Sequence, residues 1–168
     1  MRQGLSLDYL KKMGGFTLIE LIMVLIILST LAVFALPKLP HTSVFLEYEA
    51  QKILADIRYI QLRSMLRGER YRWVQISTSS YQILNQIGTP IVLPMGNTTH
   101  NLSNGVTFYG LFNLPNNLIA FGTDGMPYTT SSIPGTQLTT TGYIVLTTGS
   151  RYQIIVIYPY TGYGKLWF

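Results

Sequence analysis

The sequence predicts an α+β protein, in which a long N-terminal α-helix packs on an antiparallel β-sheet domain. Two observations lead to this fold class. Up to Gly68, a long apolar run is followed by apolar residues at the three- and four-residue spacing of a helix. From Arg70 onward, apolar and polar residues alternate with the two-residue period of a strand. The expected segments are an N-terminal tail over 1–15, an apolar helix over 16–36, a bend and an amphipathic helix over 37–68, and an exported β domain over 69–168.

The apolar run from Phe16 to Leu36 is long enough to cross a lipid bilayer. As a helix it would measure about 31 Å, close to the thickness of the hydrocarbon core. Lys11 and Lys12 precede the run, so the positive-inside rule places the N-terminus in the cytoplasm and the β domain outside. A secretory signal peptide fits less well, because its apolar region is shorter and a small-x-small cleavage site follows it. We therefore expect a single-pass membrane protein.

Glu20 is an unusual residue for this apolar segment. An acidic side chain costs roughly 2.5–3.5 kcal/mol near the middle of a membrane helix and less near its end. Either Glu20 lies shallow enough to reach the lipid headgroups, or a cation at the same depth neutralises it. A cut after Gly15 would give Phe16 a free α-amino group, and a neighbouring copy of the helix could bring that amine to Glu20. The carboxylate would then dock one subunit to another.

The stretch GGFTLIELIMVLIILSTLA resembles the class III signal of the type IV pilin and pseudopilin superfamily. It has a basic leader, Gly15 before the cut, Phe16 after it, and Glu20 fifth in the mature chain. The resemblance implies that a prepilin peptidase of the bacterial inner membrane removes residues 1–15 and N-methylates Phe16. It also implies that Glu20 pairs with the N-terminus of an adjacent subunit during assembly on an inner-membrane platform. Pro37 stands where many pilins have a helix-bending proline.

The same resemblance implies a location. Before assembly the chain would be anchored in the inner membrane with its C-terminal domain in the periplasm. After assembly it would belong to a pilus or a pseudopilus, in contact with other pilin or pseudopilin subunits.

Pro37 and Pro40 predict a bend or a melted turn before Thr42, because each removes a backbone donor and disfavours helix in the preceding residue. An amphipathic helix should follow and end near Gly68. Its apolar stripe, at spacings of three and four, comprises Leu46, Ala50, Ile53, Ile57 and Ile60. We expect this stripe to face the sheet.

The chain has a formal charge of +5, and four of its cations lie on the face of this helix opposite the apolar stripe: Lys52, Arg58, Arg63 and Arg67. Arg70 and Arg72 extend this candidate basic contact face onto the first expected strand. Such a face can bind nucleic acid, remain solvated, or contact acidic residues of a neighbouring subunit. The last two alternatives are favoured.

The β domain is expected to consist of short strands joined by turns. RYRWVQIS and SYQILNQI should form one hairpin, and GYIVLTT and RYQIIVIYP another. PIVLP is expected to be an edge strand, GVTFYGLF and NNLIAFGT two further strands, and YGKLWF a terminal strand. MGNTTHNLSNG and PYTTSSIPGTQLTTT should be loops, and Asp124-Gly125 marks a turn.

Three stretches are similar to the H-type minor pseudopilin and fimbrial T-like family. They are LADIRYIQLRSMLRGERYRWVQI, LIAFGTDGMP and YQIIVIYPYTGYGKL. DNA-binding members of that family carry a Gly-Arg-x-Arg pattern after the closing glycine, whereas here Gly162 is followed by a single cation, Lys165. Phosphate contacts need several Lys or Arg side chains. Tyr163 and Trp167 could stack on bases, so they and the cation Lys165 are weak candidates for DNA contact. DNA is not the favoured partner.

Catalysis has little support in the sequence. The absence of cysteine excludes disulfides, thiolate metal sites and cysteine nucleophiles. His41 and His100 are the only histidines, and Asp124 is the only carboxylate after Trp73. No paired carboxylates, metal-ligand spacing or phosphate loop are present. No catalytic residue, cofactor or metal is expected.

These observations together predict a non-enzymatic filament subunit. The favoured function is that of a minor pilin or pseudopilin, which helps to initiate or cap assembly of a type IV pilus or a type II secretion pseudopilus. The alternative is a binding module at the pilus tip, for DNA uptake or for surface adhesion.

Overall fold

The computed structural model describes residues 15–35, 41–93, 96–103 and 105–167. Most of the expected leader and the expected bend at Pro37 and Pro40 lie outside the described residues. The chain divides into two compact units, residues 1–39 and residues 40–168, and each is considered by itself.

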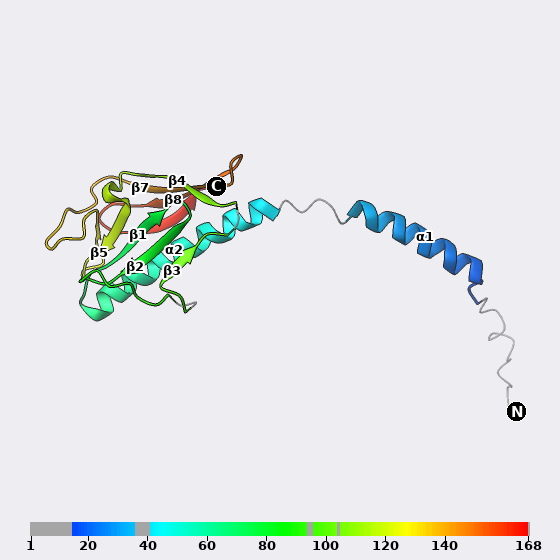
Figure 1. The fold of residues 1–168 in the computed structure, drawn as a ribbon, viewed down its shortest axis with the longest axis horizontal. Coiled ribbons are helices and arrows are strands. Elements are labelled where there is room, and N and C mark those ends of the chain that lie inside the picture. The colour runs from blue at the N-terminus through cyan, green and yellow to red at the C-terminus, as the bar shows by residue number, and fades with distance from the viewer. Residues whose placement is uncertain (1–14, 36–40, 94–95, 104, 168) are drawn as a thin grey trace, which may run out of the picture. The chain divides into compact units, whose positions relative to one another are not determined.

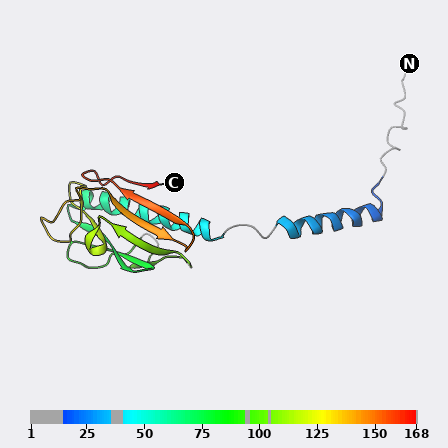
Figure 2. The ribbon, with the colours of Figure 1, turned by 90° about the horizontal axis from the view of Figure 1, so that it is seen from above.

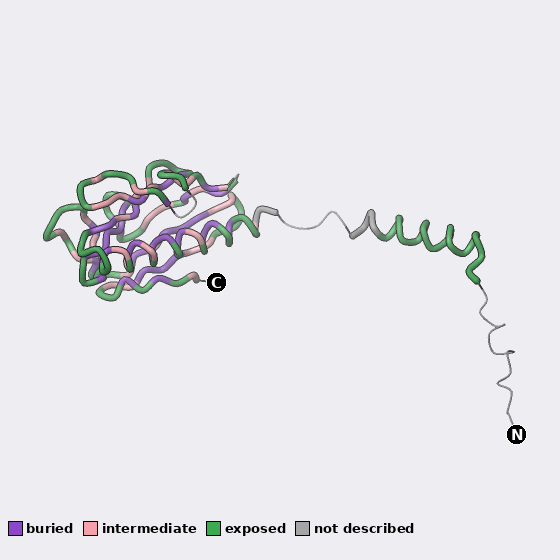
Figure 3. Tube along the Cα trace, turned by 90° about the horizontal axis from the view of Figure 1, so that it is seen from below, coloured by how far each residue is buried: buried purple, intermediate pink, exposed green. Residues whose placement is uncertain are grey.

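Among its described residues, the first unit has one helix, α1 (Leu18–Ala35). The side chains described for it, up to Leu31, are exposed within the unit (Figure 3), although most of them are apolar. In the part of the chain that the structure describes, no helix combines the length and the apolarity needed to cross a membrane. The predicted spanning segment 16–36 ends at Leu36, outside the described residues.

The second unit is built around α2 (His41–Arg67), which lies against strands of two sheets (Figure 1). Ala50, Ile53, Ile57 and Ile60 are fully buried along one side of the helix. The helix ends before Gly68, whose φ of +66° lies in the left-handed region that favours glycine. The predicted apolar stripe and helix end are confirmed.

The first sheet has five antiparallel strands in the order β3-β2-β1-β5-β6. They are β1 (Tyr71–Ser77), β2 (Ser80–Leu84), β3 (Thr99–Asn101), β5 (Leu118–Phe121) and β6 (Pro127–Tyr128). The predicted hairpin of β1 and β2 is confirmed.

The prediction of an edge strand at PIVLP is wrong for residues 90–93, the part of it that the structure describes, because they form only an isolated bridge between Leu84 and Pro90. Proline has no N–H group to donate to a ladder. The strand next to β2 is instead β3, which lies in a stretch predicted to be a loop.

The second sheet has four antiparallel strands in the order β4-β7-β8-β9. They are β4 (Thr107–Phe112), β7 (Gly142–Thr147), β8 (Tyr152–Ile157) and β9 (Gly164–Trp167). The predicted hairpin of β7 and β8 and the terminal strand are confirmed. β4 and β5 are consecutive in the chain but belong to different sheets. The short 3-10 helix η2 (Pro115–Asn117) joins them, and Asn116 there has a left-handed φ of 66°, which asparagine tolerates well.

The core of the second unit lies between α2 and the two sheets, as a view at right angles to the first shows (Figure 2). Trp73 on β1 is fully buried, and its ring lies 5.3 Å from that of Tyr81 and 5.6 Å from that of Phe108. Because Phe108 belongs to the second sheet, Trp73 joins the two sheets through aromatic contacts. The α+β fold class predicted from the sequence is confirmed.

Candidate functional site

The residues that resemble the class III signal lie around the start of α1. Thr17 caps the helix: its Oγ1 accepts a hydrogen bond from the backbone N–H of Glu20 at 3.3 Å. Thr17 and Glu20 have the spacing of a capping box, a pattern that the sequence analysis missed. The positive end of the helix dipole also favours a carboxylate in this first turn. Helix capping is therefore a second, purely local explanation for Glu20.

The predicted cleavage site, between Gly15 and Phe16, lies in a non-helical segment before α1. Phe16 is 81% exposed. A Cβ atom built on Gly15 would meet no atom within 4 Å, so nothing described around it requires a glycine. Exposed, non-helical backbone is the kind of segment that proteases cleave.

Three helix cations of the candidate basic face contact groups within the second unit. Lys52 Nζ lies 4.0 Å from Asp56 Oδ2. Arg58 donates a hydrogen bond to the carbonyl of Gly164 on β9 at 2.8 Å. Arg63 donates to a tyrosine hydroxyl one turn earlier on α2 and also lies over two tyrosine rings. Each of these three cations therefore has at least one polar contact inside the protein.

Arg70 is not part of an exposed basic face, because only 6% of it is exposed. Its guanidinium donates to the carbonyls of Ser132 and Pro134, the second at 3.0 Å. It also lies 4.0 Å from the centroid of the Tyr128 ring. Arg70 therefore anchors the loop that follows β6, a segment whose sequence has no strand or helix period.

The two remaining cations differ from each other. Arg72 is half-buried on β1, and burial lowers the pKa of its guanidinium from the usual value. Arg67 is exposed in the last turn of α2, where the helix dipole favours a cation. The six residues of the candidate basic face therefore occupy different environments, from exposed to almost fully buried.

A carboxylate that the sequence analysis did not single out connects α2 to the segment after β3. Glu49 is 1% exposed and accepts hydrogen bonds from the Ser103 backbone N–H, at 2.9 Å, and from the Ser103 hydroxyl. His100 Nε2 lies 2.7 Å from its other oxygen. Burial opposes ionisation, but the hydrogen bonds with His100 and Ser103 outweigh it and hold the pKa of Glu49 below its usual value.

A second buried acid lies one heptad further along α2. Asp56 accepts a hydrogen bond from the Tyr81 hydroxyl, and burial together with the Asp56 charge raises the pKa of Tyr81. Glu49 and Asp56 stand next to positions of the apolar stripe, seven residues apart. That spacing was a signal in the sequence that these two acids face inward.

This polar network does not have the geometry of a catalytic site. The Ser103 hydroxyl donates to Glu49 and not to His100, so no imidazole is aligned to take its proton, and the lowered pKa of Glu49 makes that carboxylate a weak base. Asp124 is a turn residue, since its Oδ1 accepts from the Met126 N–H at 3.0 Å. Among the residues that the structure describes, no group of three or more His, Cys, Asp or Glu could hold a metal ion.

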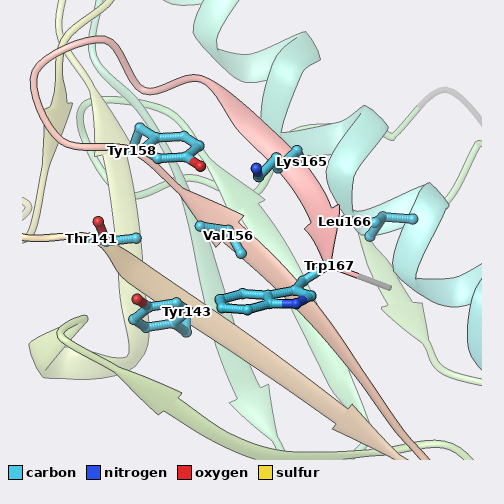
Figure 4. Close-up of a pocket in the computed structure, with 7 residues that line it drawn as sticks. All are labelled: Thr141, Tyr143, Val156, Tyr158, Lys165, Leu166 and Trp167. Atoms are coloured by element: carbon cyan, nitrogen blue, oxygen red, sulfur yellow. The ribbon is translucent and has the colours of Figure 1, made fainter.

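A groove of about 430 Å³ lies on the second sheet and contains two of the three weak DNA candidates (Figure 4). Trp167 is 59% exposed there. Lys165 Nζ lies 5.4 Å from the centroid of the Tyr158 ring, and hydrogen bonding with Tyr158 raises the pKa of Lys165. Tyr163 is not among the lining residues and instead lies beneath the guanidinium of Arg58, 6.0 Å away.

Comparison with known proteins supports the resemblance found in the sequence. Residues 10–36 match the family model described as the prokaryotic N-terminal methylation motif. None of the curated proteins compared with the chain matches it. Two crystal structures of the type IV minor pilin FimU from Pseudomonas aeruginosa (strain PAO1), in space groups P21 and P65, have a similar fold, with TM-scores of 0.51 and 0.50.

The similarity to the FimU structures concerns the fold. The sequence identities are 11% and 12%, each alignment covers 72% of this chain, and the alignments cover 87% and 91% of the FimU chains. The methylation motif covers a shorter part of the chain, residues 10–36, around α1.

Proposed function

We propose that the chain is a type IV pilin-like subunit that helps to initiate or cap a type IV filament. The proposal rests on the prokaryotic N-terminal methylation motif at residues 10–36 and on a fold similar to that of a minor pilin. Proteins of this fold family are structural and not enzymatic. The filament is a type IV pilus or a type II secretion pseudopilus, and the neighbouring genes would separate these two.

The observation that supports this proposal best is the start of α1. An exposed apolar helix begins at Leu18 and carries an acid in its first turn, and no described cation contacts that acid. Removing such a helix from water is favourable by about 25 cal/mol per Å² of apolar area, whether a bilayer or neighbouring helices cover it. We propose that the helix is held in the membrane before assembly and lies among neighbouring helices in the filament, where the α-amino group of Phe16 pairs with Glu20.

The environment of Gly15 is consistent with processing at this site. The described structure leaves room for a side chain at Gly15, so the fold gives no reason for a glycine there. A peptidase that recognises the residue before the cut would supply one. We propose that residues 1–15 are removed and that Phe16 becomes the N-methylated first residue.

Mass spectrometry of the protein recovered from cells with active prepilin peptidase tests this proposal. The expected N-terminus is methylated Phe16, and the protein should occur in the fraction of sheared surface filaments or, for a pseudopilus, in cross-links to other pseudopilins. A chain that retains Met1 in such cells would contradict the processing step. A processed chain that never associates with other pilins would contradict the assembly function.

A second candidate function is that of a binding module at the filament tip, and the groove on the second sheet favours it. The DNA version has weaker support. Arg58 and Arg70 are committed to carbonyl groups within the protein, and the groove has one cation, Lys165. Gel-shift titration of residues 41–168 at two salt concentrations tests this version, and salt-sensitive binding of DNA would favour it.

A further inference from the structure

The groove is formed by the face of the second sheet that points away from α2. The registers place Tyr143, Val156 and Lys165 in one row across β7, β8 and β9. Ile154 and Trp167 belong to the neighbouring row, and directly opposite residues of antiparallel strands point to the same side. The other side of the same strands is directed to the core, because Ile144 and Ile155 are fully buried there. The groove is thus built on the regular face of a sheet.

The lining of the groove combines flat rings, hydroxyl groups and one ammonium group. It consists of Thr141, Tyr143, Val156, Tyr158, Lys165, Leu166 and Trp167. In Figure 4 the Trp167 ring extends over the strands toward Tyr143, and Lys165 is directed toward Tyr158. Val156, only 3% exposed, forms the floor. The volume of about 430 Å³ is within the roughly 300–1,000 Å³ that small-ligand sites occupy.

We propose that this groove binds an oligosaccharide that carries carboxylate groups. A sugar ring would stack its C–H face on Trp167, and its carboxylate would pair with Lys165. No Asp or Glu is among the described residues that line the groove, so the ammonium group faces no competing side chain of these residues. The hydroxyls of Thr141, Tyr143 and Tyr158 offer donors and acceptors to sugar hydroxyls. This ligand goes beyond the proposed assembly function and does not depend on it.

The structure favours a saccharide over two other classes of ligand. Nucleic acid needs several phosphate contacts for useful affinity, and the groove offers one cation. An extended peptide would need an open strand edge to pair with. The outer strand β9 is flanked by α2, and the carbonyl of Gly164 already accepts a hydrogen bond from Arg58. A sugar needs only the exposed face of the sheet and the ammonium group.

Binding of labelled saccharides to the full chain in detergent micelles tests the proposal. Fluorescence anisotropy would compare trisaccharides of galacturonic and mannuronic acid with a neutral galactose trisaccharide. We expect at least one acidic trisaccharide to bind about tenfold more tightly than the neutral one. Lys165→Gln should remove that preference, and Trp167→Ala should weaken binding by about tenfold or more.

Matched controls are available on the same sheet. Tyr152 is 55% exposed, close to the value for Trp167, and Arg151 is an exposed cation, yet neither lines the groove. Tyr152→Ala and Arg151→Gln should change the affinity by less than about twofold. Near-ultraviolet circular dichroism, which is sensitive to the buried Trp73, would show that each variant is folded.

Three outcomes would overturn the proposal. The first is absence of binding of either acidic trisaccharide at millimolar concentration. The second is equal affinity for acidic and neutral trisaccharides. The third is an equal loss of binding in Tyr152→Ala and Trp167→Ala, which would indicate a non-specific apolar face. Salt-sensitive binding of an oligothymidylate without saccharide binding would assign the groove to nucleic acid instead.

Discussion

Replacing Glu49 by alanine should destabilise the second unit by about 3–4 kcal/mol. The change removes the acceptor for the Ser103 N–H, the Ser103 hydroxyl and His100 at a residue that is 1% exposed. Each buried donor left without a partner costs about 1–3 kcal/mol, and partial access to water at Ser103 and His100 reduces the sum. Glu49→Gln keeps the volume and one acceptor oxygen, so it should cost about 1–2 kcal/mol.

The advantage of wild-type Glu49 over the glutamine variant should depend on pH. Hydrogen bonds hold the pKa of Glu49 below its usual value in the folded protein, so the unfolded chain binds the proton more tightly. The stabilisation is therefore fully present above about pH 5 and is lost as the pH falls through the lowered pKa of the folded state. The difference in unfolding free energy between wild type and Glu49→Gln should shrink in this range.

Urea unfolding of residues 41–168, followed by circular dichroism at several pH values between neutral and acidic, measures both effects. Glu47→Gln is the matched control, because Glu47 is an exposed acid of the same helix that accepts a hydrogen bond from Gln51. It should change the free energy of unfolding by less than about 0.5 kcal/mol. If the wild-type protein and Glu49→Gln lost stability in parallel on acidification, the assignment of the lowered pKa to Glu49 would be wrong.

Three further substitutions test the packing of the second unit. Arg70→Ala should lower the free energy of unfolding by about 2–4 kcal/mol and speed proteolysis within 129–136, because the guanidinium anchors that loop. Unchanged protease sensitivity would contradict this function. Gly162→Ala should lower the free energy of unfolding in urea by about 2–4 kcal/mol, because φ is +64° and a Cβ would lie 2.6 Å from the Phe121 ring. An unchanged free energy of unfolding would show that the turn adapts. Arg67→Ser should change unfolding by less than about 0.5 kcal/mol, and a larger loss would reveal a contact of Arg67.

The elements predicted correctly are those whose signal is local. The α2 stripe and the hairpins β1–β2 and β7–β8 repeat a helical or a two-residue period over contiguous residues. The division into two sheets could not be predicted in this way. β4 and β5 have similar strand patterns, and the choice of sheet depends on a turn at Asn116 and on pairing with distant strands. β3 was missed because its polar residues pair only at the edge of the sheet.

The candidate sites also differ in whether their residues are contiguous in the chain or are brought together by the fold. Gly15, Phe16 and Glu20 form a contiguous motif, so the sequence could identify them without a fold. The groove brings together residues from β7, β8 and β9, and its shape follows from strand register. The environment of Arg70 could not be predicted from the sequence either, because its partners lie about sixty residues away in the chain. Within the second unit, the buried acids Glu49 and Asp56 did have a local signal, because they stand beside the apolar stripe.

The most direct test of subunit docking is the incorporation of a Glu20→Gln variant into filaments, measured relative to wild type after shearing or cross-linking. Glutamine retains the capping-box geometry with Thr17 but removes the charge, so it separates docking from helix capping. We expect a variant that is inserted in the membrane, cleaved before Phe16, and strongly depleted from filaments. Normal incorporation of the processed variant would show that Glu20 acts as a helix cap and that no charge pair with a neighbouring N-terminus is needed for assembly.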